Sequence, residues 1–295
     1  MKKDRIVTIL SNKEVAKDIY EMILQVADFP CDMRGGQFIH IALPSEVHLL
    51  RRPFCIADFN AKEKTVTVSY AVVGEGTALL STLKEGQTLK ALFPLGNGFY
   101  FDSNVKKVAM VGGGMGVAVL PAIPTADPNL EYVSFLGFAN KNKAIFVDDL
   151  KKKGDVYIAT DDGSVGVKGF VTTLLRQSID YVKPDVIVCC GPEVMYKSLK
   201  KEMEGIDIPI YVSLERRMGC GIGACLVCNC KVKTANGEKY LRACADGPIF
   251  KLEDIVLWVI WKLILQELSL KILLLQHQEL LVLAESTAII MICLF

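Results

Sequence analysis

Five of the ten cysteines lie between Met218 and Cys244, in the run MGCGIGACLVCNC and the later RAC. Cys220, Cys225 and Cys228 have the spacing C-x4-C-x2-C, and Cys244 follows after fifteen intervening residues. This is the ligand spacing of plant-type [2Fe-2S] clusters. We therefore expect the four cysteines to be metal ligands, and this segment to be a loop built around them.

The glycines between these cysteines favour the same interpretation. A loop that wraps a sulfide-bridged cluster turns backbone N–H groups toward the sulfurs, and Gly219, Gly221 and Gly223 permit the φ values that this requires. Four thiolates also suit tetrahedral Zn²⁺, but structural zinc sites usually pair their ligands as two C-x2-C knuckles, and only one is present. Cys230 falls in an expected strand, Cys230–Val232, and is predicted to be a bystander.

The composition indicates several packed cores and no nucleic-acid footprint. With 295 residues, 51% of them hydrophobic, there is room for two or three domains. The 34 basic and 33 acidic residues leave a net charge of +1, without a long basic stripe. We therefore expect small-molecule or protein partners and no nucleic acid. The opening MKKDRIVTIL runs into the polar SNKEV, which predicts no signal peptide and a reducing cytoplasm, where disulfides are rare.

Residues 1–100 predict an antiparallel barrel. Short β-rich runs alternate with turn signals, and such even spacing is typical of a closed or nearly closed barrel. The expected strands are Arg5–Leu10, Tyr20–Gln25, Phe38–Leu43, Thr65–Val72 and Thr88–Leu92.

Two motifs in this half suit a phosphate-bearing ligand. The motif RRPFC (51–55) offers a guanidinium fork that can hold a phosphate, although an arginine pair is also common on a solvated edge. The motif GEGT (74–77) precedes an expected helix, Ala78–Leu83, whose free N–H groups can receive a pyrophosphate. The plainer alternative is a glycine turn with Thr77 as a helix N-cap.

A second domain is expected from about residue 101. Val105–Val111 is a continuous apolar run, and GGGMG (112–116) separates it from an expected helix, Val117–Ile123. A strand, a glycine turn and a helix start form an anion-binding arrangement suited to a dinucleotide pyrophosphate, although glycine turns are common without ligands. The candidate residues are Gly113, Gly114 and Gly116.

Alternating strands and helices continue beyond this turn and predict a doubly wound parallel sheet. Its last strand ends in CGP (190–192), and ligands lie at the carboxyl ends of such strands. Cys190 is otherwise explained as one more small buried residue. The expected strands are Tyr132–Gly137, Val156–Thr160 and Val186–Cys190, and the expected helices are Val167–Gln177 and Glu193–Met203.

The order of these parts, a flavin barrel, a nucleotide sheet and an iron-sulfur loop, resembles that of the ferredoxin reductase family. The segments RRPF, GEGT, GGGMG, CGPEVM and ERRMGCGIGACLVCNC resemble more narrowly the electron transfer subunit of NAD-linked (class 1B) dihydroorotate dehydrogenase. The resemblance implies an FAD-binding β-barrel over residues 1–100, an NAD-binding α/β domain over 101–212 and a [2Fe-2S] domain over 213–258.

The resemblance also implies roles for particular residues. At Cys55 the chain departs from the serine or threonine of that family, and sulfur is a poor hydrogen-bond partner. NAD rather than NADP is implied, although Asn140, Lys141 and Lys143 follow the second nucleotide strand and could meet a 2′-phosphate. The expected FAD contacts are Arg52, Pro53, Phe54, Cys55, Ser69, Tyr70, Ala71, Gly76 and Thr77. The expected NAD contacts are Gly113, Gly114, Gly116, Gly191 and Pro192, with Cys190 a catalytic candidate near the nicotinamide.

The same resemblance implies a function and a partner. An FMN-bearing catalytic subunit would oxidise dihydroorotate to orotate in pyrimidine (UMP) synthesis, and electrons would pass through [2Fe-2S] and FAD to NAD⁺. Two copies of each subunit would form a cytoplasmic heterotetramer, away from any membrane. Two alternatives stay open: a subunit of an NADH-dependent ferredoxin or sulfide oxidoreductase, and a non-catalytic zinc-binding module.

Residues 259–295 differ from the rest of the chain. They contain no Gly, Pro, Asp, Asn or Arg, and eleven of these 37 residues are leucine. Lys271, His277, Glu279 and Glu285 interrupt the apolar stretches before any reaches a membrane-spanning length. An amphipathic helix for a partner or a membrane surface is one interpretation.

Reversing the genetic code gives a second interpretation of these residues. If Ile260 is ATA and Trp261 is TGG, the shifted frame can encode MEINIAGVEFKNPIITASGTFGFGREY, which resembles the start of a dihydroorotate dehydrogenase catalytic subunit. We therefore expect that the genuine protein ends near Trp258 and that the tail is a downstream gene read out of frame.

Overall fold

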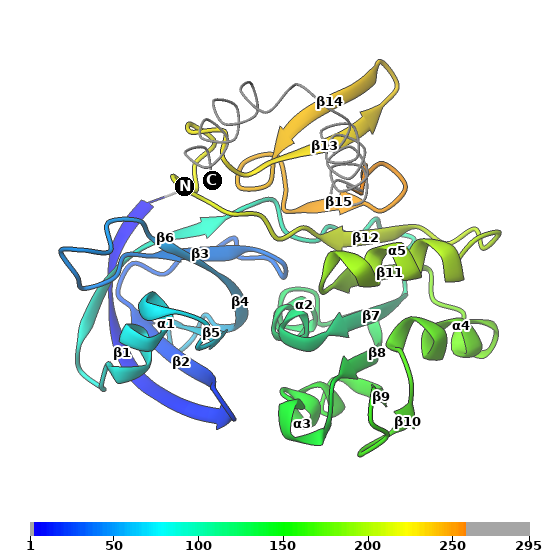
Figure 1. Ribbon diagram of the computed structural model, residues 1–295, viewed down its shortest axis with the longest axis horizontal. Coiled ribbons are helices and arrows are strands. Elements are labelled where there is room, and N and C mark those ends of the chain that lie inside the picture. The colour runs from blue at the N-terminus through cyan, green and yellow to red at the C-terminus, as the bar shows by residue number, and fades with distance from the viewer. Residues whose placement is uncertain (1–2, 258–295) are drawn as a thin grey trace, which may run out of the picture. The chain divides into compact units, whose positions relative to one another are not determined.

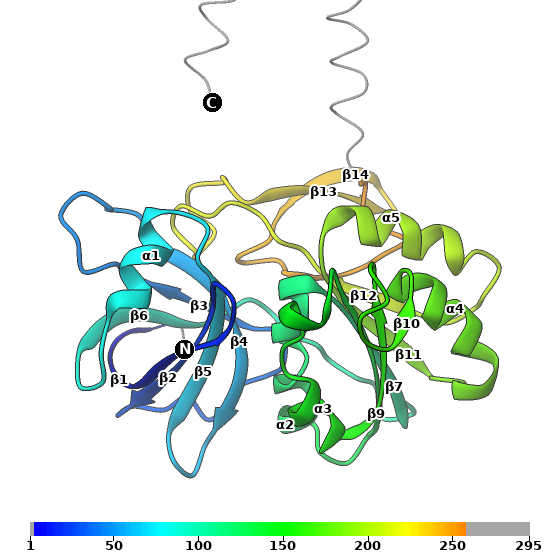
Figure 2. The same cartoon turned by 60° about the horizontal axis from the view of Figure 1, so that its bottom comes forward.

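The computed structural model describes residues 3–257, which form a closed barrel, a seven-stranded sheet and a two-stranded hairpin (Figures 1 and 2). The expectations for residues 259–295 lie outside the described residues. Among residues 3–257, no helix is long and apolar enough to cross a membrane.

The predicted antiparallel barrel is confirmed, with one strand more than the five expected. Six strands close in the order β1-β2-β5-β4-β3-β6. The additional strand, β4, begins at the second arginine of the RRPFC motif. It is mostly half-buried, and its sequence lacks the hydrophobic alternation that marks its neighbours. The barrel strands and their helix are β1 (Lys3–Ala16), β2 (Ile19–Val26), β3 (Phe38–Ile41), β4 (Arg52–Asn60), β5 (Thr65–Ala71), α1 (Glu75–Thr82) and β6 (Thr88–Leu95).

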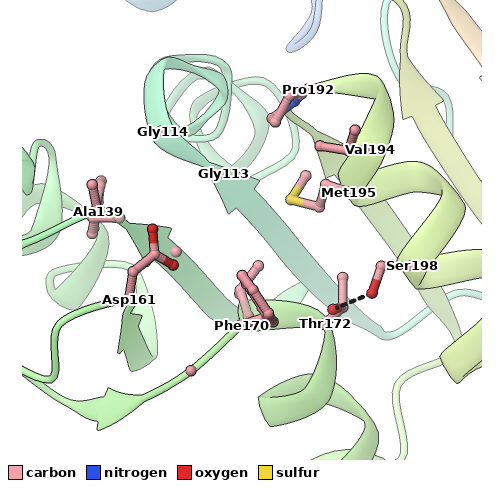
Figure 3. Close-up of a pocket in the computed structure, with 14 residues that line it drawn as sticks. Gly113, Gly114, Ala139, Asp161, Phe170, Thr172, Pro192, Val194, Met195 and Ser198 are labelled. Atoms are coloured by element: carbon pink, nitrogen blue, oxygen red, sulfur yellow. Dashed lines mark hydrogen bonds between the residues drawn. The ribbon is translucent and has the colours of Figure 1, made fainter.

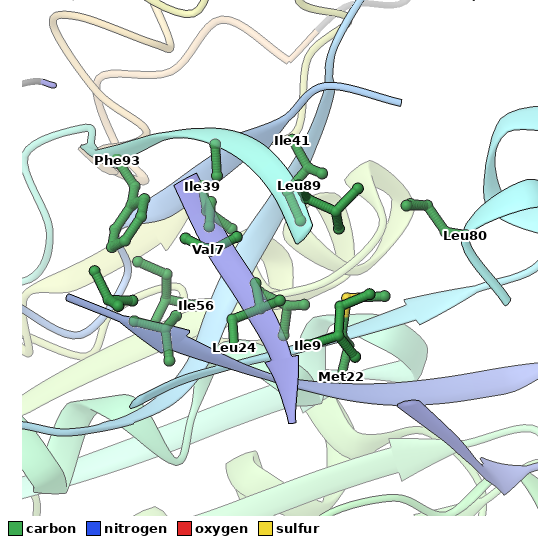
Figure 4. Close-up of a cluster of buried hydrophobic side chains, with 14 of the residues drawn as sticks. Val7, Ile9, Met22, Leu24, Ile39, Ile41, Ile56, Leu80, Leu89 and Phe93 are labelled. Carbon is green, nitrogen blue, oxygen red and sulfur yellow. The ribbon is translucent and has the colours of Figure 1, made fainter. Parts of the chain in front are cut away.

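Side chains from alternate positions of the strands fill the barrel (Figure 4). Burying an aliphatic side chain of this size contributes about 1.5–3 kcal/mol. On β3, Ile39 and Ile41 belong to this core, so Phe38 and His40 point to the opposite face. All four residues of β3 are nevertheless buried, because another part of the chain covers its outer face.

The predicted doubly wound sheet is also confirmed, in the order β10-β9-β8-β7-β11-β12-β15. Its neighbouring strands are parallel except for β15, which pairs antiparallel with β12. Figure 2 shows α4 and α5 on one face of the sheet and α2 and α3 on the other. The elements are β7 (Lys107–Gly113), η1 (Gly114–Val119), α2 (Ala122–Ala126), β8 (Glu131–Phe138), η2 (Lys141–Lys143), α3 (Val147–Lys151), β9 (Gly154–Thr160), β10 (Val167–Lys168), α4 (Val171–Val182), β11 (Val186–Cys190), α5 (Glu193–Glu202), β12 (Ile210–Ser213) and β15 (Ile249–Lys251).

Two expected helices of this half need correction. The helix expected over Val117–Ile123 is a 3-10 turn, η1, followed by the short α2, whose N-cap is Pro121. The helix expected over Val167–Gln177 starts only at Val171, because Gly169 has φ +134° and ends the short strand before it.

The cysteine segment leads from β12 into a hairpin of β13 (Asn229–Thr234) and β14 (Gly237–Arg242). The strand expected at Cys230–Val232 lies inside β13, as predicted. The chain then returns to the parallel sheet as β15, so residues 213–258 contribute an edge strand to the preceding sheet. The two domain boundaries predicted within residues 3–257, at 100/101 and 212/213, remain predictions.

Candidate functional site

The four predicted ligands are arranged as two pairs of thiols. Cys228 Sγ and Cys244 Sγ lie 3.2 Å apart, and the Cys244 N–H donates to Cys228 Sγ at 3.4 Å. In the other pair, the Cys220 N–H donates to Cys225 Sγ and the Cys225 N–H donates to Cys220 Sγ, each at 3.4 Å. A [2Fe-2S] cluster holds two irons, each with two cysteine ligands, and two pairs of thiols fit that requirement.

Backbone N–H groups surround the first pair, as the glycine-rich sequence predicts. Ile222 and Ala224 donate N–H groups to Cys220 Sγ at 3.4 and 3.3 Å. Burial raises the pKa of the Cys220 thiol, but the N–H groups of Cys225 and Ile222 outweigh it and lower that pKa to about 6. The loop is therefore built to stabilise a thiolate, the form that binds metal.

The second pair lies deeper. Cys228 and Cys244 are buried, and burial followed by the neighbouring Cys228 raises the pKa of the Cys244 thiol to about 12. Within residues 3–257, no three His, Cys, Asp or Glu side chains converge closely enough to bind one metal ion. A single tetrahedral zinc ion needs its ligands around one point, so the paired thiols suit a two-iron cluster better.

The cysteine loop packs directly on the barrel. Phe38 of β3 and Leu95 of β6 form a buried cluster with Cys228, Ala243 and Cys244. Phe38 pairs with Cys55 in the β3–β4 register, and His40 pairs with Pro53. One strand, β3, therefore separates the metal-ligand segment from β4, which contains the predicted flavin contacts.

The two predicted phosphate motifs meet on the barrel. A Cβ built on Gly76 would lie 3.0 Å from Arg52 Nε and 3.2 Å from Arg52 Nη2, so the guanidinium lies against the first turn of α1. The neighbouring Arg51 makes a bidentate pair with Asp4, with both N–O distances 2.9 Å. Arg52, not Arg51, is therefore the arginine placed beside a helix N-terminus.

Thr77 organises that helix start. Its Oγ1 accepts from the N–H groups of Val73 and Gly74 at 2.9 and 3.2 Å. The first N–H groups of an α-helix have no intrahelical acceptor, so those of Glu75 and Gly76 are the donors that this turn can offer an anion. The expectation that Thr77 is the N-cap of a helix over Ala78–Leu83 is wrong, because α1 begins at Glu75 with Gly74 as its N-cap and Thr77 lies in the first turn. The phosphate interpretation of GEGT remains a prediction.

The other expected flavin residues lie on β4 and β5. Ser69 and Tyr70 are buried and already bonded, Ser69 Oγ to Tyr20 O at 3.0 Å and Tyr70 OH to Asn12 Oδ1 at 2.9 Å. Pro53, Phe54, Cys55 and Ala71 are half-buried. The tilted ring of Phe54 lies 5.5 Å from that of Tyr70.

A cavity of about 420 Å³ opens at the carboxyl ends of β7, β8 and β9 (Figure 3). Of the residues expected to contact the dinucleotide, Gly113, Gly114 and Pro192 line it. Asp161 and Phe170 line it too, and neither was expected from the sequence. Only their positions in the sequence could have indicated them, since Asp161 directly follows a parallel strand and Phe170 directly precedes a helix. The complete lining is Gly113, Gly114, Gly137, Phe138, Ala139, Asp161, Gly169, Phe170, Val171, Thr172, Pro192, Val194, Met195 and Ser198.

The other residues expected near the dinucleotide, Gly116, Gly191 and Cys190, do not line this cavity and pack against protein atoms. A Cβ on Gly116 would lie 2.2 Å from the Cys190 carbonyl oxygen, so this glycine lets η1 approach β11. A Cβ on Gly191 would lie 2.2 Å from Met195 Cε. Cys190 itself is fully buried, and burial followed by the nearby Cys55 raises its pKa well above the ordinary thiol value. It is therefore a neutral thiol.

Two of the three side chains that could have met a 2′-phosphate, those of Asn140 and Lys143, have other partners, whereas the bond of Lys141 is made by its backbone. The Asn140 side chain accepts from the Asn142 N–H at 3.0 Å, and Lys143 Nζ donates to Lys17 O at 2.7 Å. The Lys141 N–H donates to Ser164 Oγ at 2.8 Å. The carboxylate of Asp161, rather than a cation, lines the adjoining cavity.

Glu215 lies between β12 and the first cysteine of the run, and it was not among the residues expected from the sequence. It interacts electrostatically with Cys55 of β4 and with Cys190 of β11. Its side chain is exposed, yet the protein around it removes enough water to raise its pKa. Burial, followed by Glu215, raises the pKa of the Cys55 thiol to about 12.

Comparison with known proteins gives a consistent set of relatives. A family model described as the iron-sulfur cluster binding domain of dihydroorotate dehydrogenase B matches residues 215–256. A relative from Streptococcus thermophilus named dihydroorotate dehydrogenase B (NAD(+)), electron transfer subunit, is 41% identical over 257 residues, covering 84% of this chain and 97% of its own. A relative of the same name from Bacillus pumilus is 40% identical, over 86% of this chain and 99% of its own length. Another from Streptococcus mutans is also 40% identical, over 85% of this chain and 97% of its own length.

Solved structures agree on the fold. The NADH-dependent reduced ferredoxin-NADP oxidoreductase superimposes with a TM-score of 0.74 at 30% identity, over 85% of this chain and 90% of that chain. A ferredoxin NADP⁺ reductase from Neisseria gonorrhoeae with bound FAD and NADP gives 0.58 at 16% identity, over 70% and 92%. The fold is thus of the ferredoxin reductase type, as predicted. With relatives of about 40% identity matched over nearly their whole length, the chain belongs to the family of dihydroorotate dehydrogenase B (NAD(+)) electron transfer subunits.

Proposed function

We propose that this chain takes electrons from the FMN of a dihydroorotate dehydrogenase catalytic subunit and delivers them to NAD⁺ as dihydroorotate becomes orotate in pyrimidine synthesis. The observation that best supports this relay is the single strand, β3, between the cysteine pairs and the flavin motif of β4. Neighbouring strands lie about 4.8 Å apart, so the strand that contacts the cysteine segment is the direct neighbour of the strand with the flavin motif.

Each cofactor has residues that fit it. Arg52 would hold the FAD diphosphate together with the N–H groups at Gly76, while β4 and β5 support the flavin ring. Cys220, Cys225, Cys228 and Cys244 would bind [2Fe-2S]. When bound, FAD exchanges single electrons with an iron-sulfur cluster and a hydride with a nicotinamide, which is why it belongs between them.

NAD would occupy the cavity at the carboxyl ends of the parallel strands. Gly113 and Gly114 leave room for a diphosphate, and Gly114 has φ +55° with open space beside it. Pro192 would border the nicotinamide end. Cys190 is neutral and buried beneath it, so it is suited to packing and not to proton transfer at ordinary pH.

The cysteine loop also offers a docking surface. Ile222, Leu226 and Val227 are 50%, 58% and 56% exposed around Cys225, an unusual concentration of apolar side chains beside a metal ligand. Such a patch suits an FMN-bearing catalytic subunit that must bring its own cofactor near the cluster. We propose a heterotetramer with two copies of each subunit, in the cytoplasm, with Met218–Ile222 in the interface.

One structural neighbour keeps a second function in view. The NADH-dependent reduced ferredoxin-NADP oxidoreductase shares the fold at 30% identity, which corresponds to the ferredoxin-linked alternative. The dihydroorotate dehydrogenase relatives are closer in sequence, at about 40%, and favour the proposal. A zinc-binding module is disfavoured, because the matched family model is of an iron-sulfur domain.

The tail hypothesis supports the choice of partner and has its own test. We propose three functional parts, residues 1–100, 101–212 and 213–258, followed by an out-of-frame tail. Sequencing the gene across Ile260 to Thr287 should reveal the start of a catalytic subunit in the shifted frame. If that frame encodes no such start, the tail hypothesis fails.

Spectroscopy tests the relay in the purified full chain. After anaerobic reconstitution with iron, sulfide and FAD, the protein should show flavin and iron-sulfur absorption, and NADH should bleach both. NADPH at the same concentration should act more slowly. A protein that retains neither chromophore, or whose bands do not respond to NADH, would contradict the proposal.

A further inference from the structure

His40 is a fully buried histidine whose ring nitrogens have only weak partners, the backbone groups of Arg51 and Cys220. It lies in β3 with no solvent exposure, and neither Nδ1 nor Nε2 has a partner with good geometry within residues 3–257. A neutral imidazole has one N–H donor and one acceptor. Leaving a buried polar group unsatisfied is costly, so a buried ring without a well-formed hydrogen bond requires an explanation.

The ring faces the cysteine loop. Because Ile39 and Ile41 point into the barrel, His40 and Phe38 share the outer face of β3, and Phe38 packs with the second cysteine pair. A Cβ built on Gly221 would lie 2.6 Å from His40 Nδ1. Gly221 also has φ +72°, so only glycine lets the loop lie this close to the ring.

The imidazole carries at least one ring N–H that can donate in either protonation state. Burial lowers the pKa of His40, and the charges of Arg51 and Arg52 lower it further. The backbone of Arg51 and of Cys220 acts in the opposite direction without overcoming these effects. The interaction with the Cys220 backbone places the ring beside the residue that is the first predicted ligand of the cluster.

His40 also stands next to the flavin motif. Its partner in the β3–β4 register is Pro53, the residue after Arg52. The imidazole therefore lies on the strand that separates the cysteine loop from the predicted flavin contacts. A group in that position can act on both the placement of the cluster and its electron affinity.

We propose that His40 is a positioning residue for the [2Fe-2S] cluster, donating its ring N–H to a sulfur on the Cys220 side and fixing the cysteine loop on β3. A hydrogen bond to a cluster sulfur stabilises the reduced, more negative state and raises the reduction potential. The inference rests on the proposed function only through the assignment of Cys220 as a ligand.

The test compares His40→Leu and His40→Gln with wild type in the full chain carrying FAD and a reconstituted cluster. His40→Leu removes the donor, and His40→Gln keeps an amide N–H. Ile39→Val, which points into the barrel, is the matched control on the same strand. The readouts are the cluster potential from a redox titration followed by electron paramagnetic resonance, the shape of that signal, and FAD content.

His40→Leu should make reduction of the cluster about tenfold less favourable, a shift of about 59 mV for one electron, and should change the signal shape. His40→Gln should recover most of the shift, and Ile39→Val should match wild type. An unchanged potential and signal in His40→Leu would overturn the proposal.

Loss of the cluster has a defined meaning as well. If His40→Leu binds FAD but assembles no cluster, recovery of assembly in His40→Gln supports the hydrogen bond, and failure to recover contradicts it. If His40→Leu does not fold, the cluster potential of His40→Gln is the test. A potential near that of wild type supports the proposal, and a potential far below it contradicts the proposal. Absence of a cluster from wild type would instead refute the ligand assignment.

Discussion

Cys228 Sγ and Cys244 Sγ are 3.2 Å apart because the β13–β14 hairpin returns the chain to its starting point. Asn229 pairs with Arg242 at the open end of the hairpin, and the Ala243 N–H donates to Cys228 O at 2.9 Å. The distant fourth ligand is thus positioned by ordinary strand pairing. The fifteen residues between these two cysteines are the hairpin, Asn229–Arg242, and Ala243.

Replacing Cys244 by serine should abolish the [2Fe-2S] cluster while leaving FAD bound. The oxygen of serine is a poor substitute for a thiolate on iron, and the pair with Cys228 is lost. Iron and sulfide analysis together with visible absorption measure the outcome. Stoichiometric cluster in Cys244→Ser would remove this residue from the ligand set.

Cys230→Ser is the matched control for that experiment. Cys230 is also buried and lies two residues beyond Cys228, but its Sγ contacts Leu241 O at 3.4 Å within the hairpin. We expect wild-type iron content in this variant. Loss of iron from this variant, with folding intact, would show that Cys230 is a cluster ligand and that the predicted ligand set is wrong.

Arg52→Ala should weaken FAD binding by about 10- to 100-fold. A hydrogen bond to a charged group contributes about 1.5–3 kcal/mol, and 1.4 kcal/mol corresponds to a factor of ten. The neighbouring Arg51→Ala should have a much smaller effect, because Arg51 is paired with Asp4. Fluorescence titration of the apoprotein with FAD compares them, and equal losses in both variants would refute the assignment.

Asp161→Asn should reduce the preference for NADH over NADPH by about tenfold. A carboxylate in the nucleotide cavity can accept hydrogen bonds from ribose hydroxyls and repels a 2′-phosphate. Asp162→Asn is the control, since the exposed Asp162 bonds to the Ser164 N–H at 2.9 Å. Rates of flavin reduction by each nucleotide give the ratio, and the prediction fails if both variants keep the wild-type ratio.

Asp185 should make stability depend on pH. Its Oδ2 accepts from the N–H groups of Lys106 and Lys107 at 2.8 Å each, and these bonds lower its pKa. A depressed folded-state pKa gives stability that is present above the unfolded value of about 3.9 and is lost as pH falls through the folded value. Because Asp185 is exposed, Asp185→Asn should cost only about 1 kcal/mol at neutral pH. Urea unfolding measures the free energy of unfolding of both proteins, and the difference between them should shrink below about pH 4. A difference that stays constant across this pH range would contradict the prediction.

The sequence predicted features that repeat or have fixed spacing. Strand alternation gave the barrel and the parallel sheet, and the cysteine spacing gave a ligand set whose members lie together in pairs. It missed β4, in which Arg52 and Pro53 interrupt the alternation, because this segment is a strand through its pairing with β3 and β5. The residue pattern of a single segment does not show which other strands that segment pairs with.

The unpredicted residues owe their positions to tertiary contacts. His40 is one histidine in an apolar strand, and only the packing of Gly221 against its ring distinguishes it. Asp161 becomes notable because three strands end at one cavity. Gly116, by contrast, was expected to contact the dinucleotide. In the structure it lets η1 pack closely against the backbone of Cys190.

The most direct test of the relay is dihydroorotate-dependent reduction of NAD⁺. The full chain is co-expressed with an FMN-bearing dihydroorotate dehydrogenase catalytic subunit, and the purified complex is compared with that subunit alone. Our account predicts NADH formation by the complex, none by the catalytic subunit alone, and none by a complex containing Cys244→Ser. NADH formation that does not require this chain, or none when both proteins are present with their cofactors, would contradict it.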